Sequence, residues 1–276
     1  MPIDAAGDGR GTEFLGISFA TAPFEEVLSW CLSRPGRHAF VYAVTPNVDH
    51  VIRLFPRRPA PVTQAFRNSY AHAAIRCCDS RILHRLARIA GIDLPVVTGS
   101  DLTAALFTRG FGAGDRVALI GGGEDTIKRL ETRFPGPIFV QHIPPMGLAT
   151  NEAAMESAAD FLEDADADYV LFAVGAPQSE MLAHRCARRS RLRGLGLCIG
   201  ASVDFLLGDQ RRAPRWMQRA GLEWLFRLLS EPARLWRRYL VEGPRVFILF
   251  RQWQKGRLSP LTNGNDAHAG GVQKSK

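Results

Sequence analysis

The chain has 276 residues, of which 46% are hydrophobic, and carries a formal net charge of +8. This length suffices for one full core with an additional segment. No uncharged apolar run reaches the roughly 18 residues of a transmembrane helix, and the opening MPIDAAGDGRGTEF lacks the apolar stretch of a signal peptide. Five cysteines without a CxxC pair are typical of a reducing compartment and predict no metal site. We therefore expect a cytoplasmic protein whose membrane contact is peripheral.

Apolar segments that predict strands alternate with helical patterns along the chain. After residues 1–12, which we expect to be disordered, strands are predicted at 39–44, 73–78, 116–121, 137–143, 169–174 and 195–200. Helices are predicted near 48–55, 80–90, 124–134, 151–163 and 178–190, and Gly99 to Leu102 predict a helix start capped by Ser100 or Asp101. Such alternation is typical of a parallel sheet covered by helices on both faces. For residues 13–210 we predict an α/β core with a Rossmann-like parallel sheet flanked by helices.

Most of the predicted strands end at glycine or at a small polar side chain. In strand order these ends include Thr45 and Asn47, Asp79, Gly121 to Gly123, Gly175, and Gly200. Because the carboxyl ends of parallel strands meet at one edge, where open α/β sheets bind ligands, we predict a crevice there. Glycine is also an ordinary turn residue. That explanation suits Thr45, Asn47 and Asp79 less well, since no turn geometry requires them after an apolar run.

Asp79 is the sharpest catalytic candidate among these residues. Its carboxylate would stand beside an apolar strand, where burial can raise its pKa toward that of a useful general base. A second role, as N-cap of the helix SRILHRLARIA, explains the residue equally well. His50 and His84 lie on the helices after Thr45 and Asp79, and we expect each to be a packed or solvated histidine.

Gly121, Gly122 and Gly123 precede the predicted helix EDTIKRLETRF. Backbone N–H groups at the start of a helix can bind phosphate, which makes Gly121, Gly122 and Gly175 nucleotide-binding candidates. The pattern contains neither GxGxxG nor a P-loop GK[ST]. Two acidic residues in the first turn also disfavour an anion, so this signal favours a nucleotide without specifying one.

Residues 211–257, which we call the C-terminal appendage, differ from the rest of the chain. They hold twelve Lys and Arg against three Glu, a balance of +9, whereas the whole chain carries +8. Four of the five tryptophans also lie here: Trp216, Trp224, Trp236 and Trp253. Basic and aromatic side chains together suit the headgroup layer of an anionic membrane. We predict a membrane-docking appendage on a near-neutral body that folds without it, followed by a disordered tail at 258–276.

Proline and glycine divide the appendage into predicted short helices. Pro214 can start one helix, Gly221 ends it, and Pro232 and Pro244 start two more. After Pro232, apolar side chains fall on one helical face and arginines on the other. The apolar face contains Leu235, Trp236, Tyr239 and Leu240, and the basic face contains Arg234, Arg237 and Arg238.

Two other interpretations of the appendage stay open. A basic arm can bind nucleic acid through base stacking on its aromatic side chains, and a helical tail can pack on the body. The tryptophans argue against a fully solvated tail. The wide apolar stripe argues against an arm that tracks phosphates, so we expect a membrane surface and no nucleic acid as partner.

Several segments match a known family in sequence, order and spacing. These are VTPNVDH (44–50), CDSRILHRLARIAGIDLPVVTGSDL (78–102), VALIGG (117–122), VGAPQSE (174–180) and the stretch from IGASVDF to LWRRY (199–239). Together they resemble the WecG/TagA/CpsF family of bacterial glycosyltransferases. The resemblance covers about residues 14–252, and RAPRWMQRAGLEW is its most specific part.

The resemblance implies an inverting transfer of a sugar from a UDP-sugar to a polyprenyl-diphosphate-linked saccharide, without a cofactor or metal. The setting would be the inner face of the cell membrane, in the biosynthesis of cell-surface polysaccharides such as exopolysaccharides. Asp79 matches the proposed general base, and Thr45 and Asn47 match substrate-contacting positions. Arg212 and Arg215 lie in the best-matched stretch, where arginine is expected to stabilise the departing diphosphate.

Two positions depart from the family pattern. Ser80 replaces the glycine that usually follows the aspartate, and Ser179 stands where a functional glutamine is expected. The neighbouring Gln178 is the candidate for that substrate contact, and the donor sugar stays open. Two other classes compete with a glycosyltransferase. A Rossmann-type oxidoreductase is disfavoured by the missing dinucleotide fingerprint, and a non-enzymatic protein would bind nucleic acid through the appendage.

Overall fold

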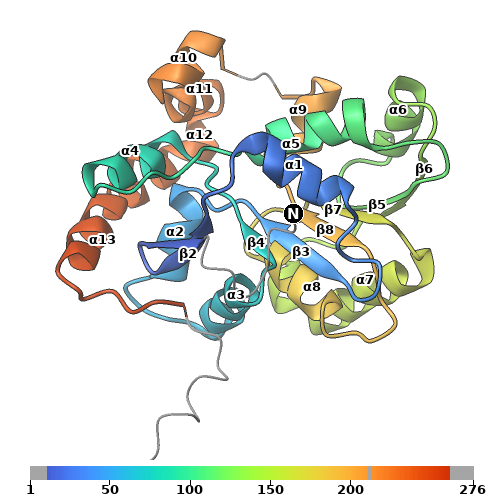
Figure 1. Ribbon diagram of the computed structural model, residues 1–276, viewed down its shortest axis with the longest axis horizontal. Coiled ribbons are helices and arrows are strands. Elements are labelled where there is room, and N and C mark those ends of the chain that lie inside the picture. The colour runs from blue at the N-terminus through green and yellow to red at the C-terminus, as the bar shows by residue number, and fades with distance from the viewer. Residues whose placement is uncertain (1–10, 211–212, 262–276) are drawn as a thin grey trace, which may run out of the picture.

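A computed structural model describes residues 11–210 and 213–261, and its centre is a sheet with helices on both sides (Figure 1). The sheet has six strands in the order β4-β3-β8-β7-β5-β6, all paired in parallel. They are β3 (Val41–Val44), β4 (Ile75–Arg76), β5 (Arg116–Ile120), β6 (Ile138–His142), β7 (Tyr169–Phe172) and β8 (Leu195–Cys198). All six lie inside the predicted segments, so the predicted α/β fold with a parallel sheet is confirmed.

Helices cover both faces of the sheet and bury two separate cores. One face carries α2 (Val48–Leu54), α3 (Pro61–Ala71), α4 (Arg81–Ile89), α7 (Glu152–Ala165) and α8 (Gln178–Cys186), and the other carries α1 (Phe24–Leu32), α5 (Gly99–Ala105), α6 (Thr126–Arg133) and α9 (Ser202–Leu207). Successive strand side chains point to opposite faces. Val170 and Phe172 therefore join the first core and Tyr169 and Leu171 the second. This is why β7 has no polar alternation.

Some elements were not predicted from the sequence. An antiparallel hairpin of β1 (Gly11–Phe14) and β2 (Ile17–Ala20) precedes the sheet, and helices α1 and α3 are also additional. The predicted disorder of residues 1–12 is wrong for residues 11 and 12, which belong to β1; residues 1–10 lie outside the described part. Helix α5 is capped by Thr98, whose Oγ1 accepts from the Asp101 N–H at 3.0 Å. The predicted cap at Ser100 or Asp101 is wrong because the helix begins earlier, at Gly99.

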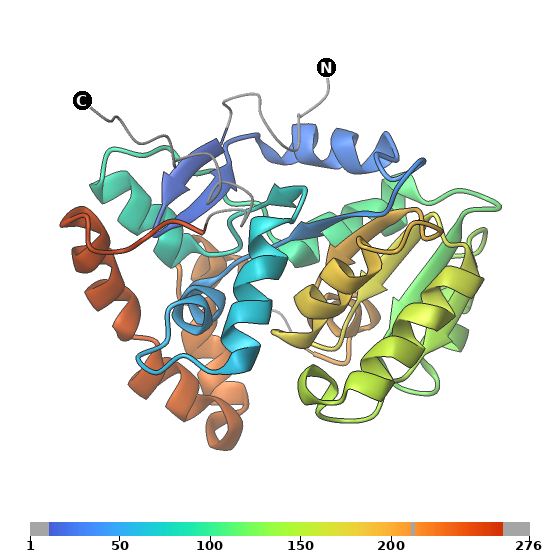
Figure 2. The same cartoon turned by 90° about the horizontal axis from the view of Figure 1, so that it is seen from below.

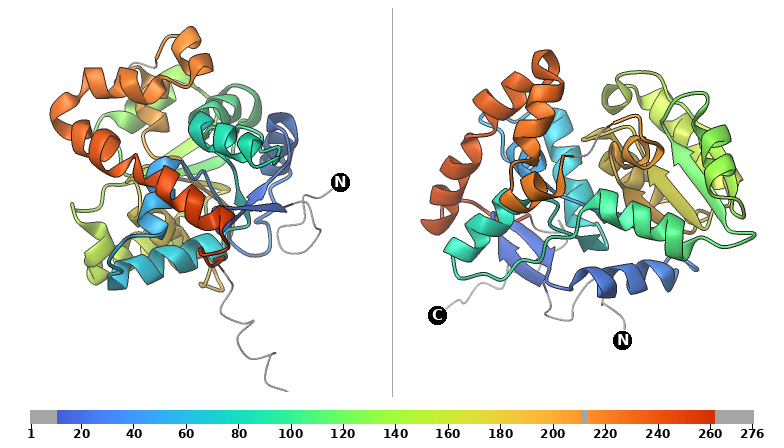
Figure 3. Two further views of the ribbon diagram at one scale, coloured as in Figure 1. Left: turned by 90° about the vertical axis from the view of Figure 1, so that its left-hand side faces the viewer. Right: turned by 90° about the horizontal axis from the view of Figure 1, so that it is seen from above.

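The C-terminal appendage consists of short helices, as its proline and glycine residues predicted. They are α10 (Arg215–Ala220), α11 (Glu223–Ser230), α12 (Pro232–Trp236), the π-helical segment η3 (Arg237–Glu242) and α13 (Arg245–Gln254). Gly221 has a φ of +71° between α10 and α11, where glycine is favoured. Figure 3 shows these helices along one side of the molecule, with α7 on the opposite side. Within residues 11–210 and 213–261, no helix is both long enough and apolar enough to cross a membrane.

Helix α13 is part of the first core and not a detachable tail. Val246, Leu249 and Phe250 are buried in that core. The ring of Phe14 in the hairpin lies 6.1 Å from that of Phe250 and 5.1 Å from that of Trp253, measured between centroids. The prediction of a body that folds without the appendage stays a prediction, and the cover that α13 gives to apolar side chains of the hairpin argues against it.

Two hydrogen bonds further join the end of the described chain to the hairpin. The Trp253 Nε1–H donates to Glu13 Oε1 at 2.9 Å, and the Leu261 N–H donates to the Gly16 carbonyl at 2.8 Å. Figure 2 shows α13 beside the hairpin. The tail predicted to be disordered from residue 258 is thus held by the hairpin at Leu261, and residues 262–276 lie outside the described part.

The predicted separation of apolar and basic faces after Pro232 is only partly observed. Leu235 is buried, whereas Trp236 is 52% and Leu240 is 55% exposed. Arg238, expected on the outer polar face, lies partly buried against Asp49. A π-helical turn begins at Arg237 and changes the angle between successive side chains from the α-helical value on which the prediction rested.

Candidate active site

A cleft of about 850 Å³ opens at the carboxyl ends of the central strands, where the pattern of strand ends predicted a crevice. Thr45 follows β3, Asp79 follows β4, Gly175 follows β7 and Gly200 follows β8, and all four line it. The opposite wall comes from α4 and the appendage. It includes Arg85, Ile89, Trp224, Arg227, Arg234, Arg238, Tyr239, Leu240 and Phe247. The sheet edge and the appendage therefore enclose one site between them.

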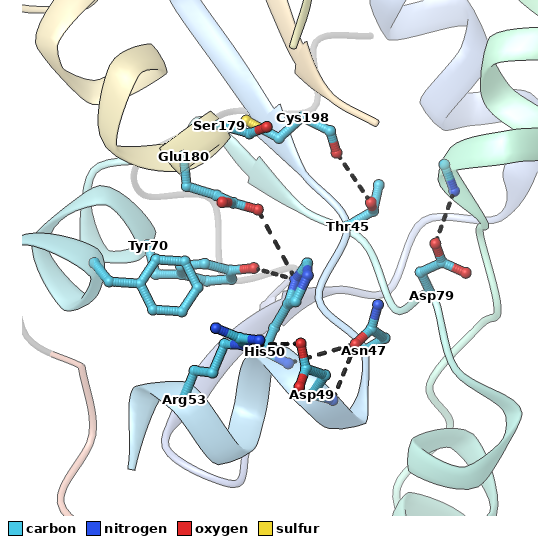
Figure 4. Close-up of polar contacts among 12 residues, drawn as sticks. Thr45, Asn47, Asp49, His50, Arg53, Tyr70, Asp79, Ser179, Glu180 and Cys198 are labelled. Atoms are coloured by element: carbon cyan, nitrogen blue, oxygen red, sulfur yellow. Dashed lines mark hydrogen bonds and ion pairs between the residues drawn. The ribbon is translucent and has the colours of Figure 1, made fainter. Parts of the chain in front are cut away.

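Thr45 and Gly99 hold the strand end next to Asp79. The Thr45 Oγ1–H donates to the Cys198 carbonyl at 3.2 Å, which ties the end of β3 to β8. A Cβ on Gly99 would lie 3.0 Å from Thr45 Oγ1, so a larger residue would push the two segments apart. From this close position the Gly99 N–H donates to Asp79 Oδ2 at 3.2 Å (Figure 4).

Asp79 is not the cap of helix α4. Ser80 is the N-cap residue, and its Oγ accepts from the Leu83 N–H at 3.3 Å. The capping explanation for Asp79 is therefore wrong, and its carboxylate lines the cleft instead. Burial raises the pKa of Asp79 to about 7, although the Gly99 N–H opposes this shift. A carboxyl group with such a pKa exchanges a proton readily near neutral pH.

Asn47 lines the cleft and also has a structural role that the sequence analysis did not assign. Its Oδ1 accepts from the backbone N–H groups of Asp49 at 3.0 Å and His50 at 3.4 Å, and so caps helix α2. This explains an asparagine directly after the strand. The cap uses Oδ1 of the Asn47 side chain, so its Nδ2 is the group that can donate a hydrogen bond to a ligand.

A buried acidic residue, Glu180, lines the cleft from the first turn of α8. Its Oε1 lies 3.9 Å from His50 Nδ1, which forms a hydrogen bond of 2.7 Å with the hydroxyl of Tyr70. Burial raises the pKa of Glu180 to about 7 and lowers the pKa of His50 to about 4. Sequence reasoning did not select Glu180; its position just after a strand-end glycine was the available signal.

Arginines outnumber carboxylates around the cleft. Six line it (Arg53, Arg81, Arg85, Arg227, Arg234 and Arg238), against the four acidic residues Asp49, Asp79, Glu180 and Glu223. Arg238 of the appendage lies 3.2 Å from Asp49, which also binds Arg53 Nε at 2.8 Å. Burial raises the pKa of Asp49, but the two guanidinium groups outweigh this effect and hold the pKa below its usual range. One carboxylate thus faces two cations, which leaves positive charge for a ligand.

The two arginines selected from the sequence are not placed by the structure. Arg212 lies outside the described residues. Helix α10 begins at Arg215, but the side chain of this residue is also outside the described part. Their predicted contacts with diphosphate stay predictions.

Two of the three predicted nucleotide-binding glycines lie away from the cleft. Gly175 lines it, whereas Gly121 and Gly122 do not. The Gly121 N–H donates to the His142 carbonyl at 2.9 Å, and the Gly123 N–H donates to Thr126 Oγ1 at 2.8 Å. These two groups are thus used inside the protein, so the expected phosphate contact at this loop has little support.

Gln178 also lies away from the cleft. Its Nε2 donates to the Val174 carbonyl at 2.9 Å, whereas the next residue, Ser179, is buried and lines the cleft. The structure therefore gives no sign that Gln178 replaces the expected glutamine. Within the described ranges, no group of three or more His, Cys, Asp or Glu could hold a metal ion; a reaction without metal stays a prediction.

An open parallel sheet with a cleft at its carboxyl edge places the chain in the class of α/β proteins that bind their ligands at that edge. The chain belongs to the WecG/TagA/CpsF family of glycosyl transferases, whose family model matches residues 12–259. The match spans the sheet and the appendage together. The family predicted from the sequence is therefore confirmed, and the protein is a glycosyltransferase.

Proposed function

We propose that this glycosyltransferase moves a sugar, with inversion, from a UDP-sugar to a polyprenyl-diphosphate-linked saccharide, with Asp79 as general base. The observation that carries the proposal is the position of Asp79, a cleft-lining carboxyl group opposite a wall that bears several arginines. The product would belong to a cell-surface polysaccharide pathway on the inner face of the cell membrane.

Asp79 has the properties that deprotonation of an acceptor hydroxyl requires. The hydroxyl must lose its proton as its oxygen attacks the anomeric carbon, and a base that is ionised near neutral pH does this best. Burial brings the pKa of Asp79 into that range. The Gly99 N–H fixes one carboxylate oxygen, so the other is oriented for the acceptor. Thr45 and Asn47, which follow the neighbouring strand β3, would contact the substrates beside it.

The appendage arginines are suited to the departing UDP diphosphate. In an inverting displacement, the leaving group departs on the side opposite the attacking hydroxyl, and positive charge there stabilises the transition state. Arg227, Arg234 and Arg238 line the appendage wall. The Nε of Arg238 is buried without a hydrogen-bond partner among the described residues. A planar guanidinium that retains a free donor is well suited to a phosphate oxygen.

A set of exposed apolar side chains on α4 and the appendage fits an acceptor that carries a lipid. We call it the apolar rim, and it consists of Ile89, Leu229, Trp236, Leu240, Val241, Phe247 and Ile248, all more than half exposed. Three of them, Ile89, Leu240 and Phe247, also line the cleft. Apolar and aromatic side chains beside arginines favour the interface of an anionic membrane. We infer that the apolar rim docks there and directs the cleft toward lipid-linked acceptors.

The proposal is tested by incubating the purified full chain with a panel of UDP-sugars and a synthetic polyprenyl-diphosphate saccharide. We expect mass spectrometry to detect one extended acceptor and NMR to show an inverted anomeric configuration. Retention of configuration, or no transfer from any UDP-sugar, would contradict it. Thermal shifts with UDP, NAD and a short oligonucleotide test the competing classes. Stabilisation by NAD or by the oligonucleotide, and not by UDP, would favour an oxidoreductase or a nucleic-acid-binding protein.

A further inference from the structure

Glu180 is a buried carboxyl group for which the proposed reaction has no use. It is 1% exposed, yet it lines the same cleft as Asp79. Its Oε2 has no hydrogen-bond partner among the described residues, and its Oε1 is 3.9 Å from His50 Nδ1, beyond hydrogen-bond distance. A buried polar atom without a partner is costly and rare in native proteins.

The neighbouring charges compensate Glu180 only in part. His50 is the nearest titratable group, but burial lowers the pKa of His50 to about 4, so the imidazole is neutral at physiological pH. Its Nδ1 is already bonded to the Tyr70 hydroxyl. The cations Arg53 and Arg238 both bind Asp49. The backbone N–H of Glu180 and the charge of Arg53 oppose the rise in the pKa of Glu180, but burial outweighs them. Among the described residues, the neutral His50 is the group that lies within ion-pair distance of the carboxylate.

A purely structural role explains Glu180 less well than ligand binding. A carboxylate in the first turn of a helix interacts favourably with the helix dipole. An exposed glutamate would provide the same interaction without the cost of desolvation, and it would not leave Oε2 unpaired. Because Glu180 lies on the cleft wall, its burial is better explained by a ligand that donates hydrogen bonds to its carboxyl group.

The chemistry of Glu180 favours a ligand that donates hydrogen bonds, from O–H or N–H groups, over an anion. A carboxylate repels phosphate, and no third acidic or histidine ligand accompanies Glu180 and His50 within the described ranges to hold a metal. Carboxylates accept two O–H groups side by side, which matches the vicinal hydroxyls of a sugar ring. His50 beside it adds a neutral imidazole, which can donate or accept one further bond.

We propose that Glu180 and His50 form a hydroxyl-recognition site that binds a vicinal diol of the nucleotide-sugar donor. This inference rests on the proposed function and names a specificity-determining part of its donor site. Asp79, the base for the acceptor, follows the edge strand β4, whereas Glu180 follows β7 on the other side of β3 and β8. Figure 4 shows the two carboxylates on opposite sides of Thr45. Glu180 is therefore on the side away from the acceptor, where the donor lies.

The diol belongs either to the ribose of UDP or to the transferred hexose, and binding measurements distinguish the two. Glu180→Gln keeps the shape and removes the charged acceptor. We expect it to weaken donor binding roughly 10- to 100-fold, because charge-assisted hydrogen bonds are strong. If the ribose is bound, the variant loses affinity for UDP but not for 2′,3′-dideoxy-UDP, which lacks both hydroxyls of the diol. If the hexose is bound, UDP affinity is kept and only UDP-sugar affinity falls.

Thermal melting separates recognition from a structural role. Because Glu180→Gln removes a charge that burial penalises, we expect its Tm to be kept or raised. The matched control is Glu124→Gln, an exposed position away from the cleft. Unchanged affinities for UDP and the UDP-sugar in Glu180→Gln would overturn the inference. Equal losses for all three ligands, together with a lower Tm, would show a structural role and overturn it as well.

Failure of this inference is distinguishable from failure of the proposed function. If the wild-type chain binds neither UDP nor any UDP-sugar, the proposed function fails and Glu180 has no donor to recognise. If the wild type binds and transfers, and Glu180→Gln behaves like it, only the hydroxyl-recognition site is wrong.

Discussion

The two sides of the cleft are held in place by different means. On the body side, backbone groups fix the side chains that face the ligand. Thr45 is bonded to the Cys198 carbonyl, Asn47 caps α2 and Asp79 accepts from the Gly99 N–H. These bonds belong to the ends of strands and the starts of helices. The body side is therefore organised before any ligand binds, as a general base requires.

On the appendage side, long side chains make the connections. Arg238 reaches Asp49 at 3.2 Å, and Arg85 on α4 donates to the Ala220 carbonyl at 2.7 Å. A Cβ at Gly221 would lie 3.1 Å from the Arg85 guanidinium, so glycine permits that approach. Such contacts can exchange one partner for another. The comparison suggests a division for the proposed reaction, in which the body side holds the general base rigidly and the appendage side adapts to the ligand.

Removal of the appendage is expected to have the largest effect. Truncation after Gln210 deletes one wall of the cleft and α13, so we expect no detectable transfer and a clearly lower Tm, since Phe14 and its core neighbours lose their cover. Truncation after Leu261 is the control and should change neither. Melting of the 1–210 chain at the temperature of the full chain would show that the body is independent after all.

Asp79→Asn should reduce turnover by roughly 10²–10⁴-fold, because it removes the base and preserves the shape. Affinity for UDP should stay the same, since the body side keeps its structure. Asp93→Asn, an exposed position away from the cleft, is the matched control. A general base contributes more than about threefold to turnover. If the folded Asp79→Asn variant stays within about threefold of the wild type, Asp79 is not the base.

The pH dependence should report the same carboxyl group. Burial raises the pKa of Asp79 to about 7, so kcat/KM should rise with pH through about 7 as the base loses its proton. Below that value it should fall about tenfold per pH unit. Asp79→Asn should abolish this limb. Burial raises the pKa of Glu180 to about 7 as well. The pH profile of kcat, which reports the enzyme–substrate complex, should therefore keep its acidic limb in Glu180→Gln if this limb belongs to Asp79.

The same shifts predict how stability depends on pH. Since both carboxyl groups have a higher pKa in the folded than in the unfolded state, their contribution to folding is present in acid. It is lost as the pH rises from about 4 to about 7. Thermal melts across this range should therefore show a smaller decrease in Tm for Asp79→Asn and for Glu180→Gln than for the wild type. Parallel curves for all three proteins would contradict both assignments.

Arg238→Gln tests the appendage side. We expect roughly tenfold weaker UDP binding, because a cation near the diphosphate is lost, and little change for uridine, which has no phosphate. Asp49 keeps Arg53 at 2.8 Å, so the loss of Tm should be small. Arg251→Gln, an exposed position on α13, provides the control. Equal losses for UDP and uridine would mean that Arg238 holds the wall in place and does not contact phosphate.

The smallest effect is expected at the apolar rim. Trp236→Ala with Leu240→Ala should weaken binding to anionic vesicles roughly 3- to 10-fold, with little change in its dependence on salt, because these side chains contribute apolar burial. Their exposure predicts an unchanged Tm. Met146→Ala, a 96% exposed side chain on the body, is the matched control. If the double variant sediments with vesicles like the wild type, the rim does not dock on membranes.

The parallel sheet was predictable because its strands are buried on both faces and stand out as apolar runs. The hairpin was not, because its strands have four residues each and its turn contains Leu15 with a φ of +52°, a conformation for which leucine gives no signal. Helix α3 does begin with a proline, Pro61, which was an available start signal.

Thr45 and Asp79 could be found because each directly follows a predicted apolar run, so their positions in the sequence place them at the carboxyl edge of the sheet. Glu180 was harder to find, although it comes after the strand-end Gly175. A glutamate in a helix is usually solvated, and its burial depends on packing near His50 and Tyr70. Arg238 was assigned to an outer face by α-helical spacing. The π-helical turn from Arg237 changed that spacing, and local pattern does not predict such a turn.

The packing of the hairpin against α13 has a consequence for synthesis of the chain. Phe14 is made long before Phe250 and Trp253, which it contacts. A growing chain thus exposes the apolar side of the hairpin until α13 has been made. The appendage, which is also made late relative to the sheet, supplies the second wall of the cleft. We therefore expect a nascent chain that stops short of α13 to be unable to transfer sugar.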